Sequence, residues 1–172
     1  MVDYLNHLEL GLCLRVNALS RREAVRRFFS IVSWLGNYPA WVLFGFVVAV
    51  RQGPGTGIFA LQALATAFAG IFIYKMLKKR LVRERPYVTH GDIVCGTPPL
   101  DRYSFPSGHT LHAVCLASLY GAYDPGMLVV MGPFAALVAA SRIVLGLHYP
   151  SDVAVGGLIG ALLAAASLAV TG

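Results

Sequence analysis

Charged residues are scarce in this chain, and their scarcity excludes an ordinary soluble domain. Asp, Glu, Lys and Arg make up 13% of the 172 residues, against roughly 25% in an average soluble domain, while apolar residues make up 57%. The 14 basic residues outnumber the 8 acidic ones, which gives a formal net charge of +6. These cations stand at the ends of apolar runs and not along an aromatic-rich surface. The sequence therefore predicts contact with anionic lipid headgroups and no nucleic-acid partner.

Cysteine is also rare. Cys13, Cys95 and Cys115 are scattered and form no Cys-x-x-Cys pair, so neither a disulfide framework nor a zinc site is predicted.

The N-terminal stretch lacks the order of a cleaved signal, basic then apolar then small, because acidic residues and a histidine interrupt it. The sequence holds no internal repeat and no low-complexity linker. Its length leaves room for one domain, which we expect to cover residues 1–172.

Long uncharged runs are abundant instead. Five of them, 17 to 23 residues long, follow one another along the chain. A membrane-spanning helix needs about 20 apolar residues, with a range of roughly 17 to 25, so we expect an all-α, polytopic transmembrane helix bundle. Gly36, Asn37 and Pro39 predict a bend or a late start in the first span, and Gly156 and Gly160 predict a close helix contact in the last. The expected spans are 28–50, 58–77, 108–123, 127–144 and 151–171.

The segment before the first run predicts a helix at the membrane surface. Residues 4–19 mix apolar residues with Glu9 and Arg15, and this stretch is too short and too charged to span easily. We expect it to form an interfacial or partly embedded helix, which brings the bundle to five to six membrane helices. The basic stretch 21–27 that follows is expected to meet lipid headgroups.

Alternating spans bring three polar segments to one side of the membrane. The end of the second span, the start of the third and the turn between the fourth and fifth all emerge there, while the turns at 51–57 and 122–126 lie opposite. The shared side carries 13 of the 14 Lys and Arg residues, with Arg51 opposite. By the positive-inside rule, this side would face the cytoplasm.

The three polar segments carry side chains that handle phosphate. The first has Lys78 and Arg85, whose spacing of seven residues is close to two turns and would place both on one face of a helix. The second is the turn 104–109, Ser-Phe-Pro-Ser-Gly-His, and the third runs from Arg142 to Asp152. Residues of these kinds are often structural when they occur singly, because histidines pack, lysines snorkel and aspartates cap helices. Their occurrence together predicts a phosphate site.

Hydrolysis of a phosphate ester requires a nucleophile, a proton donor for the leaving oxygen and positive charge around the phosphoryl group. A neutral His148 is the candidate nucleophile, and Asp152, four residues later, is placed to accept its other N–H and fix the tautomer. His109 is the candidate acid for the leaving alkoxide. This scheme needs no metal ion and no cofactor. The candidates for holding the phosphate oxygens are Lys78, Arg85, Ser107, Gly108 and Arg142.

Together these residues resemble the signature of a known family, the type 2 phosphatidic acid phosphatase (PAP2) superfamily. The resemblance implies a bacterial, membrane-integral, metal-independent phosphatase that forms a phosphohistidine intermediate. It further implies that His148 is the nucleophile, that Asp152 orients it, that His109 is the general acid, and that the remaining candidates hold phosphate. The matching motifs are Lys78-x6-Arg85-Pro86, Pro106-Ser107-Gly108-His109 and Ser141-Arg142-x5-His148-x3-Asp152.

The resemblance leaves several substrates open. Family members act on lipid phosphates or on soluble phosphate esters, and the five expected spans favour a lipid within the bilayer. Candidates are phosphatidic acid, phosphatidylglycerol phosphate, a polyprenyl phosphate or diphosphate, a polyprenyl-linked sugar phosphate, and lipid A. The short chain has no extra domain for a bulky headgroup, which favours a simple lipid phosphate.

Two indications of membrane orientation conflict. The positive-inside count favours a cytoplasmic site, whereas bacterial relatives generally resemble outward-facing enzymes. Because catalysis accounts for several of the cations, we expect a multi-pass protein of the cell (inner) membrane with its site at the periplasmic, outer face.

Three other functions would use some of the same residues. An anionic-lipid binding or transport protein would need the cations but not His109, His148 and Asp152 together. A phosphotransferase would use the same site with another acceptor in place of water. A di-iron oxygenase, suggested by His109-x-x-His112, would lack ligands, because the chain has five histidines and no Glu-x-x-His pair.

Residues near the motifs have predicted roles as well. We expect His112, one turn after His109, to pack between helices. The long loop 86–104 is irregular and of a length typical of functional loops. The loop residues expected to contact the lipid headgroup are Tyr87, His90, Asp92, Arg102 and Tyr103. The basic residues expected to attract anionic lipid are Lys75, Lys79, Arg80 and Arg83.

Overall fold

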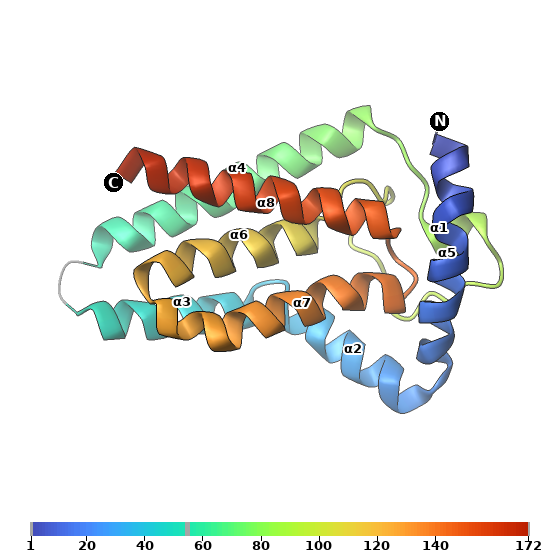
Figure 1. Cartoon of the computed structure of the whole chain (residues 1–172), viewed down its shortest axis with the longest axis horizontal. Coiled ribbons are helices and arrows are strands. Elements are labelled where there is room, and N and C mark those ends of the chain that lie inside the picture. Colours follow the sequence, from blue (N-terminus) through green and yellow to red (C-terminus); the bar gives the residue numbers. More distant parts are fainter. Residues whose placement is uncertain (1, 54–55, 172) are drawn as a thin grey trace.

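The computed structural model describes residues 2–53 and 56–171, and this part of the chain contains helices and no β-strand (Figure 1). The all-α architecture predicted from the sequence is therefore confirmed. The longer helices are α1 (Val2–Asn17), α2 (Glu23–Leu35), α3 (Pro39–Gln52), α4 (Gly57–Arg80), α6 (Gly108–Tyr123), α7 (Leu128–Val144) and α8 (Pro150–Thr171). The short ones are α5 (Pro86–Thr89) and the 3-10 helices η1 (Ala18–Arg21) and η2 (Pro125–Met127).

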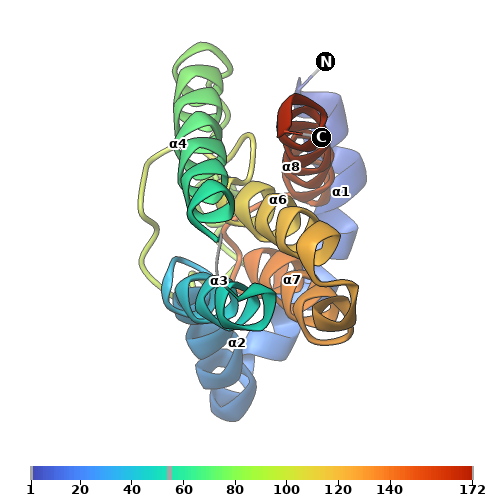
Figure 2. The same ribbon diagram turned by 90° about the vertical axis from the view of Figure 1, so that its left-hand side faces the viewer.

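α6 lies in the middle of the bundle. Figure 2 shows α4, α8, α7 and α3 around it, and it contacts all four. Its buried residues are distributed around the whole helix and do not form a single stripe. A helix that is apolar on all sides in this way belongs in a core. The helices α3, α4, α7 and α8 therefore pack around a common centre.

α8 approaches α6 closely through two glycines. A Cβ atom on Gly160 would lie 2.3 Å from the carbonyl oxygen of Leu111, and one on Gly156 would lie 2.6 Å from the carbonyl oxygen of Ser107. These distances are too short for any side chain, so the close contact predicted from the two glycines is confirmed. The contact brings the N-terminal ends of the two helices together, and the Ser107 amide donates to the Asp152 carbonyl at 3.0 Å.

Up to four units of the described chain are long and apolar enough to cross a membrane. α4, α8 and the unit Pro125–Val144 qualify alone, and α2 with α3 forms a span bent by 52°, which confirms the predicted bend. The expected third span coincides with α6, whose 16 residues rise only about 24 Å, less than the roughly 30 Å core of a bilayer. α6 begins short of the neighbouring ends of α7 and α8 (Figure 1), so the polar turn before it is recessed.

α1 lies across one end of the bundle and not along it (Figure 1). The helix expected at 4–19 is found at Val2–Asn17, and its direction suits an interfacial helix. Its last residue, Asn17, is buried and joins three segments. The Asn17 side chain donates to the carbonyl oxygens of Val94 and Val144, at 2.9 Å each, and accepts from the Val94 amide at 2.8 Å. α1 is thereby fixed to the loop after α5 and to the end of α7.

The opposite end of the bundle has its own polar contacts. Arg51 at the end of α3 forms an ion pair with Asp124, and Gln52 donates to the Tyr123 carbonyl. The prediction that the three motif segments lie on one side is confirmed, since they lie together at the α1 end of the bundle (Figure 1).

Large apolar side chains on the outer faces of α3 and α4 are exposed, as expected for lipid-facing surfaces. They include Val42, Phe46, Phe68 and Phe72.

Replacing Gly160 by alanine should lower the stability of the bundle. The added Cβ would force α8 away from the Leu111 carbonyl, and overpacking of this kind costs about 1–3 kcal/mol. Gly157→Ala is the matched control, because a Cβ there would meet the Val114 side chain at an ordinary 3.6 Å. Thermal unfolding of the purified protein in detergent should show a lower Tm for Gly160→Ala than for Gly157→Ala. Equal Tm values would contradict the close contact.

Candidate active site

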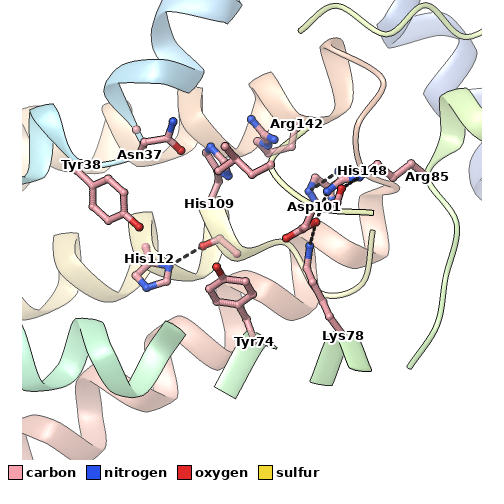
Figure 3. A pocket seen from close by; sticks show the side chains of 13 residues that line it. Asn37, Tyr38, Tyr74, Lys78, Arg85, Asp101, His109, His112, Arg142 and His148 are labelled. Carbon is pink, nitrogen blue, oxygen red and sulfur yellow. Dashed lines mark hydrogen bonds and ion pairs between the residues drawn. The ribbon is translucent and has the colours of Figure 1, made fainter. Parts of the chain in front are cut away.

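Three segments far apart in the sequence form one pocket at the α1 end of the bundle (Figure 3). They are the C-terminal end of α4 with the residues after it, the first turn of α6, and the turn between α7 and α8. The break between α2 and α3 and the loop after α5 complete its wall. The eight predicted site residues divide into six that line this pocket and two, Ser107 and Asp152, that do not. The six are Lys78, Arg85, Gly108, His109, Arg142 and His148.

His148 lies in the turn before α8 and is only 2% exposed. Its Nε2 atom is 3.3 Å from Nη1 of Arg85, and its Nδ1 atom is 3.5 Å from Oδ2 of Asp152. The second distance is longer than a hydrogen bond, and such contacts often tighten when substrate binds. Burial, followed by the positive charges of Arg85 and Arg142, lowers the pKa of His148 well below the usual value. The imidazole is therefore neutral at neutral pH.

The Asp152 carboxylate is completely buried and held on both oxygens. Oδ2 accepts from the Tyr149 amide at 2.8 Å, and Oδ1 accepts from Nη1 of Arg83 at 2.5 Å. These bonds fix the carboxylate in the first turn of α8, where its Oδ2 faces Nδ1 of His148. Asp152 thus lies behind the histidine as its spacing predicts.

Arg83 is the residue whose predicted environment was wrong. The sequence interpretation grouped it with cations that attract lipid, but its side chain is 7% exposed and turns inward. Besides Asp152, it donates to Ser151 Oγ at 2.7 Å and to Glu9 Oε2 at 3.1 Å. Its guanidinium also stacks 4.0 Å from the ring centroid of Tyr149. A buried arginine requires such partners because an unpaired charge in an apolar interior is costly.

Lys78 and Arg85 meet through a carboxylate. α4 ends at Arg80, so the expected helical face shared by the two cations does not form. Arg85 has extended backbone angles, φ −79° and ψ 152°, because the following Pro86 disfavours a helical conformation. Both side chains instead converge on Asp101 Oδ1, with Lys78 Nζ at 2.7 Å and Arg85 Nη2 at 2.6 Å. Backbone carbonyls of the surrounding loops complete the contacts of both cations.

Arg142 and His109 form the other wall of the pocket (Figure 3). Arg142 is 2% exposed, and its Nη1 atom donates to the Ser33 hydroxyl of α2. Its Nε atom has no hydrogen-bond partner among the described residues. His109 lies in the first turn of α6 and is partly exposed to the pocket. An imidazole and a planar guanidinium therefore lie on the side of the pocket that faces α2.

Ser107 supports the start of α6 and does not line the pocket. Its Oγ atom accepts from the Thr110 amide at 3.4 Å and lies 3.0 Å from the Thr110 hydroxyl. This is an N-cap arrangement, in which a side-chain oxygen satisfies an unpaired N–H of the first helical turn. Gly108 follows and does line the pocket. The positive end of the α6 dipole is consequently directed at it.

The loop after α5 enters the pocket with Leu100 and Asp101. None of the five loop residues predicted to contact a headgroup lines it, although the Tyr103 carbonyl accepts from Lys78 at 2.8 Å. An irregular loop has no periodicity from which inward positions can be derived. His112 has a packing role, because its ring nitrogens lie 2.8 Å from the carbonyl oxygen of Gly108 and 3.2 Å from that of Ala67. It also lines the pocket, which the sequence interpretation had treated as the lesser alternative.

Within residues 2–53 and 56–171, no group of three or more His, Cys, Asp or Glu side chains has the proximity that a metal ion requires.

The motif order and the geometry agree with a family comparison. The model of the PAP2 superfamily matches residues 59–172, which include all three motif segments. The chain belongs to the PAP2 superfamily. Decaprenylphosphoryl-5-phosphoribose phosphatase of Mycolicibacterium smegmatis is 36% identical over 144 residues, which cover 81% of this chain and 75% of that protein. Lipid A 1-phosphatase of Rhizobium etli is 26% identical over 161 residues, covering 82% and 69% respectively.

Solved PAP2 structures share the fold. A transmembrane PAP2-type phosphatidylglycerolphosphate phosphatase from Bacillus subtilis has a TM-score of 0.79 at 21% identity, covering 98% of this chain and 87% of that one. LpxE of Aquifex aeolicus has a TM-score of 0.75 at 24% identity and covers 94% of both chains. The prediction of a membrane-integral PAP2-type lipid phosphatase is thereby confirmed at the level of family, fold and reaction class.

Replacing Arg83 by glutamine should slow turnover without affecting substrate affinity. The change removes the bond to Oδ1 of Asp152 and releases the carboxylate behind His148. A hydrogen bond to a charged group contributes about 1.5–3 kcal/mol, so kcat should fall roughly 10- to 100-fold while KM stays within a factor of about two.

Arg80→Gln is the matched control for this experiment, because Arg80 is exposed at the end of α4. It should leave both constants unchanged. Steady-state phosphate release, measured on variants whose Tm has been checked, tests the prediction. A rise in KM at constant kcat would show that Arg83 acts on binding and not on the orientation of Asp152.

Proposed function

We propose that this PAP2 protein hydrolyses the phosphate monoester or diphosphate of a membrane lipid, without a metal ion, through a phosphohistidine intermediate. The observation that carries the proposal is the environment of His148. Its imidazole is buried and neutral, with Nε2 directed at a phosphate-binding cation and Nδ1 directed at a carboxylate. A histidine arranged in this way is a nucleophile with a fixed tautomer.

In the first step, Nε2 of His148 attacks phosphorus and the bond between phosphorus and the leaving oxygen breaks. His109 donates its proton to that oxygen, so the lipid alcohol leaves neutral. In the second step, the now neutral His109 takes a proton from water, and the resulting hydroxide attacks phosphorus and releases phosphate from His148. Asp152 accepts the Nδ1–H hydrogen bond throughout and stabilises the positive charge that the ring acquires.

The phosphoryl oxygens are held by positive charge and by the helix start. Lys78, Arg85 and Arg142 act on the non-bridging oxygens, arginine through its planar fork and lysine as a point charge. Gly108 contributes its backbone N–H at the positive end of α6, and Ser107 contributes by capping that turn. Because these groups are buried and already oriented, they stabilise the transferring phosphoryl group without reorganisation.

The substrate is proposed to be a lipid whose headgroup ends in a phosphoryl group. The recessed pocket lies at the end of a bundle with lipid-facing sides, so a lipid can enter with its tails in the bilayer. The greater identity to the decaprenylphosphoryl-5-phosphoribose phosphatases than to the lipid A 1-phosphatases makes a polyprenyl-linked sugar phosphate the first candidate. Phosphatidic acid, phosphatidylglycerol phosphate, polyprenyl phosphates and diphosphates, and lipid A are the others.

Residues 1–172 are proposed to act as one unit. The α1 residues Glu9 and Asn17 lie outside the family match, yet they bind the segments that support His148 and Asp152. The turn before α8 is therefore held by α1 as well as by the family-matched part of the chain.

Replacing His148 by alanine should abolish phosphate release, by at least about 10⁴-fold, while the protein remains folded. The assay uses purified protein in detergent, with chelator present, and a panel of the candidate lipids. A brief reaction with ³²P-labelled substrate, followed by alkaline denaturation, should trap label on the wild-type protein.

His90→Ala is the matched control, since His90 belongs to the same end of the molecule but does not line the pocket. It should retain both turnover and the trapped label. Full activity of the His148 variant would remove the assignment of the nucleophile, and release that stops with chelator would remove the metal-independent mechanism.

We propose further that the protein resides in the cell (inner) membrane with its pocket at the outer face. Cys95 provides a natural reporter, because it is exposed in the loop beside the pocket while Cys13 and Cys115 are buried. A membrane-impermeant maleimide added to intact cells should label the wild-type chain and not the Cys95→Ser variant. Labelling that requires permeabilised cells would mean that the pocket faces the cytoplasm.

A further inference from the structure

Asp101 is the one acidic residue among those that line the pocket in the described chain. Its side chain is 35% exposed, whereas the side chains of Lys78 and Arg85 are 8% and 2% exposed. The carboxylate is therefore more accessible than the two cations that it contacts. All three residues line the pocket, so a ligand that reaches Lys78 and Arg85 there also meets Asp101.

One oxygen of this carboxylate occupies the position between Lys78 and Arg85 that a phosphoryl oxygen of a bound substrate would take. Oδ1 accepts from Nζ of Lys78 at 2.7 Å and from Nη2 of Arg85 at 2.6 Å at the same time. Bridging of a lysine and an arginine by a single anionic oxygen is a typical geometry for bound phosphate. Burial alone would raise the pKa of Asp101, but the hydrogen bonds and charges of both cations outweigh it and lower that pKa. The carboxylate is charged across the neutral range.

A phosphate ligand must therefore exchange with Asp101. The main chain at Asp101 is itself fixed, since its carbonyl oxygen accepts from Arg85 Nε at 3.1 Å. A tethered group of this kind competes at a high effective concentration. A phosphomonoester carries about −1.5 to −2 charges near pH 7 and offers three terminal oxygens. A phosphodiester carries one charge, the same as the carboxylate that it would replace.

We infer that Asp101 is a specificity-determining residue, an internal counter-ion that admits phosphomonoesters and diphosphates to the pocket and excludes the phosphodiester lipids of the surrounding bilayer. A dianion that replaces the carboxylate brings more negative charge to Lys78 and Arg85 than the carboxylate does. A monoanion brings no more charge than the carboxylate, and it lacks the covalent attachment to the chain. Bulk anionic phospholipids are diesters and far outnumber any monoester lipid. Selection against them is consequently required at this position. This inference rests on the proposed function.

The test measures competition between the two lipid classes. Purified full-length protein in non-ionic mixed micelles hydrolyses dioctanoyl phosphatidic acid while dioctanoyl phosphatidylglycerol, a diester, is titrated in at constant total lipid. For Asp101→Asn, which removes the charge and keeps the shape, the inhibition constant of the diester should fall about tenfold relative to wild type. Asp101→Glu, which restores the charge, should move it back toward the wild-type value.

Glu84→Gln is the matched control. Glu84 precedes Arg85 in the chain but forms its ion pair with the exposed Arg102, outside the pocket lining. Its replacement should leave the inhibition constant of the diester unchanged. A merely structural role for Asp101 would lower Tm or kcat without changing the ratio of KM for the monoester to the inhibition constant for the diester. That outcome, or an equal diester constant in wild type and Asp101→Asn, would overturn the inference and leave the proposed function intact.

A binding measurement separates failure of the inference from failure of the proposed function. If the wild type releases no phosphate from any monoester or diphosphate in the panel, the proposed function is overturned. Titration calorimetry with dihexanoyl phosphatidylglycerol then tests Asp101 directly. Tighter binding to Asp101→Asn than to wild type supports the inference, and equal binding overturns it. If Asp101→Asn is not recovered folded, Asp101→Ser takes its place in both measurements.

Discussion

Burial of positive charge at one end of an apolar bundle is the constraint on which the rest of the structure depends. Lys78, Arg83, Arg85 and Arg142 are all buried, and a charge without partners in such surroundings is strongly unfavourable. The partners come from distant parts of the chain: Glu9 of α1 and Asp152 of α8 for Arg83, Asp101 of the long loop for Lys78 and Arg85, and Ser33 of α2 for Arg142. The segments that meet at the site are thus linked by the requirement to neutralise the cations that give it its chemistry.

Close packing of helices and placement of polar groups act together at this end. Gly156 and Gly160 allow α8 to approach α6, and this contact sets the first turns of both helices side by side. His109 belongs to one of these turns and Asp152 to the other. The proposed acid and the carboxylate behind the proposed nucleophile therefore share one rigid unit in the centre of the bundle. A phosphoryl group bound between them would meet groups that do not need to move, which is the condition for effective electrostatic stabilisation.

Sequence patterns predicted the parts of this arrangement that depend on periodicity and on local chain geometry. Alternating apolar runs were enough to place the three motif segments at one end, and Gly36 with Pro39 was enough to predict the bend. The pattern could not show which of several neighbouring cations turns inward, because Arg80 and Arg83 differ only in what they meet in space. It also could not identify Asp101, whose loop has no repeat. The shared helix face expected for Lys78 and Arg85 did not form because α4 ends at Arg80, before it reaches Arg85.

The support of the catalytic turn extends beyond the part of the chain that the family signature describes. The match begins at residue 59, yet Asn17 binds the end of α7 and Glu9 binds both Arg83 and Ser151 beside Asp152. Part of the scaffold that supports the motifs therefore lies outside the stretch that carries them. Two homologues can retain identical motifs and still diverge in the N-terminal helix that braces them. In such a lineage, compensating substitutions would be found in pairs, one in α1 and one around the turn before α8.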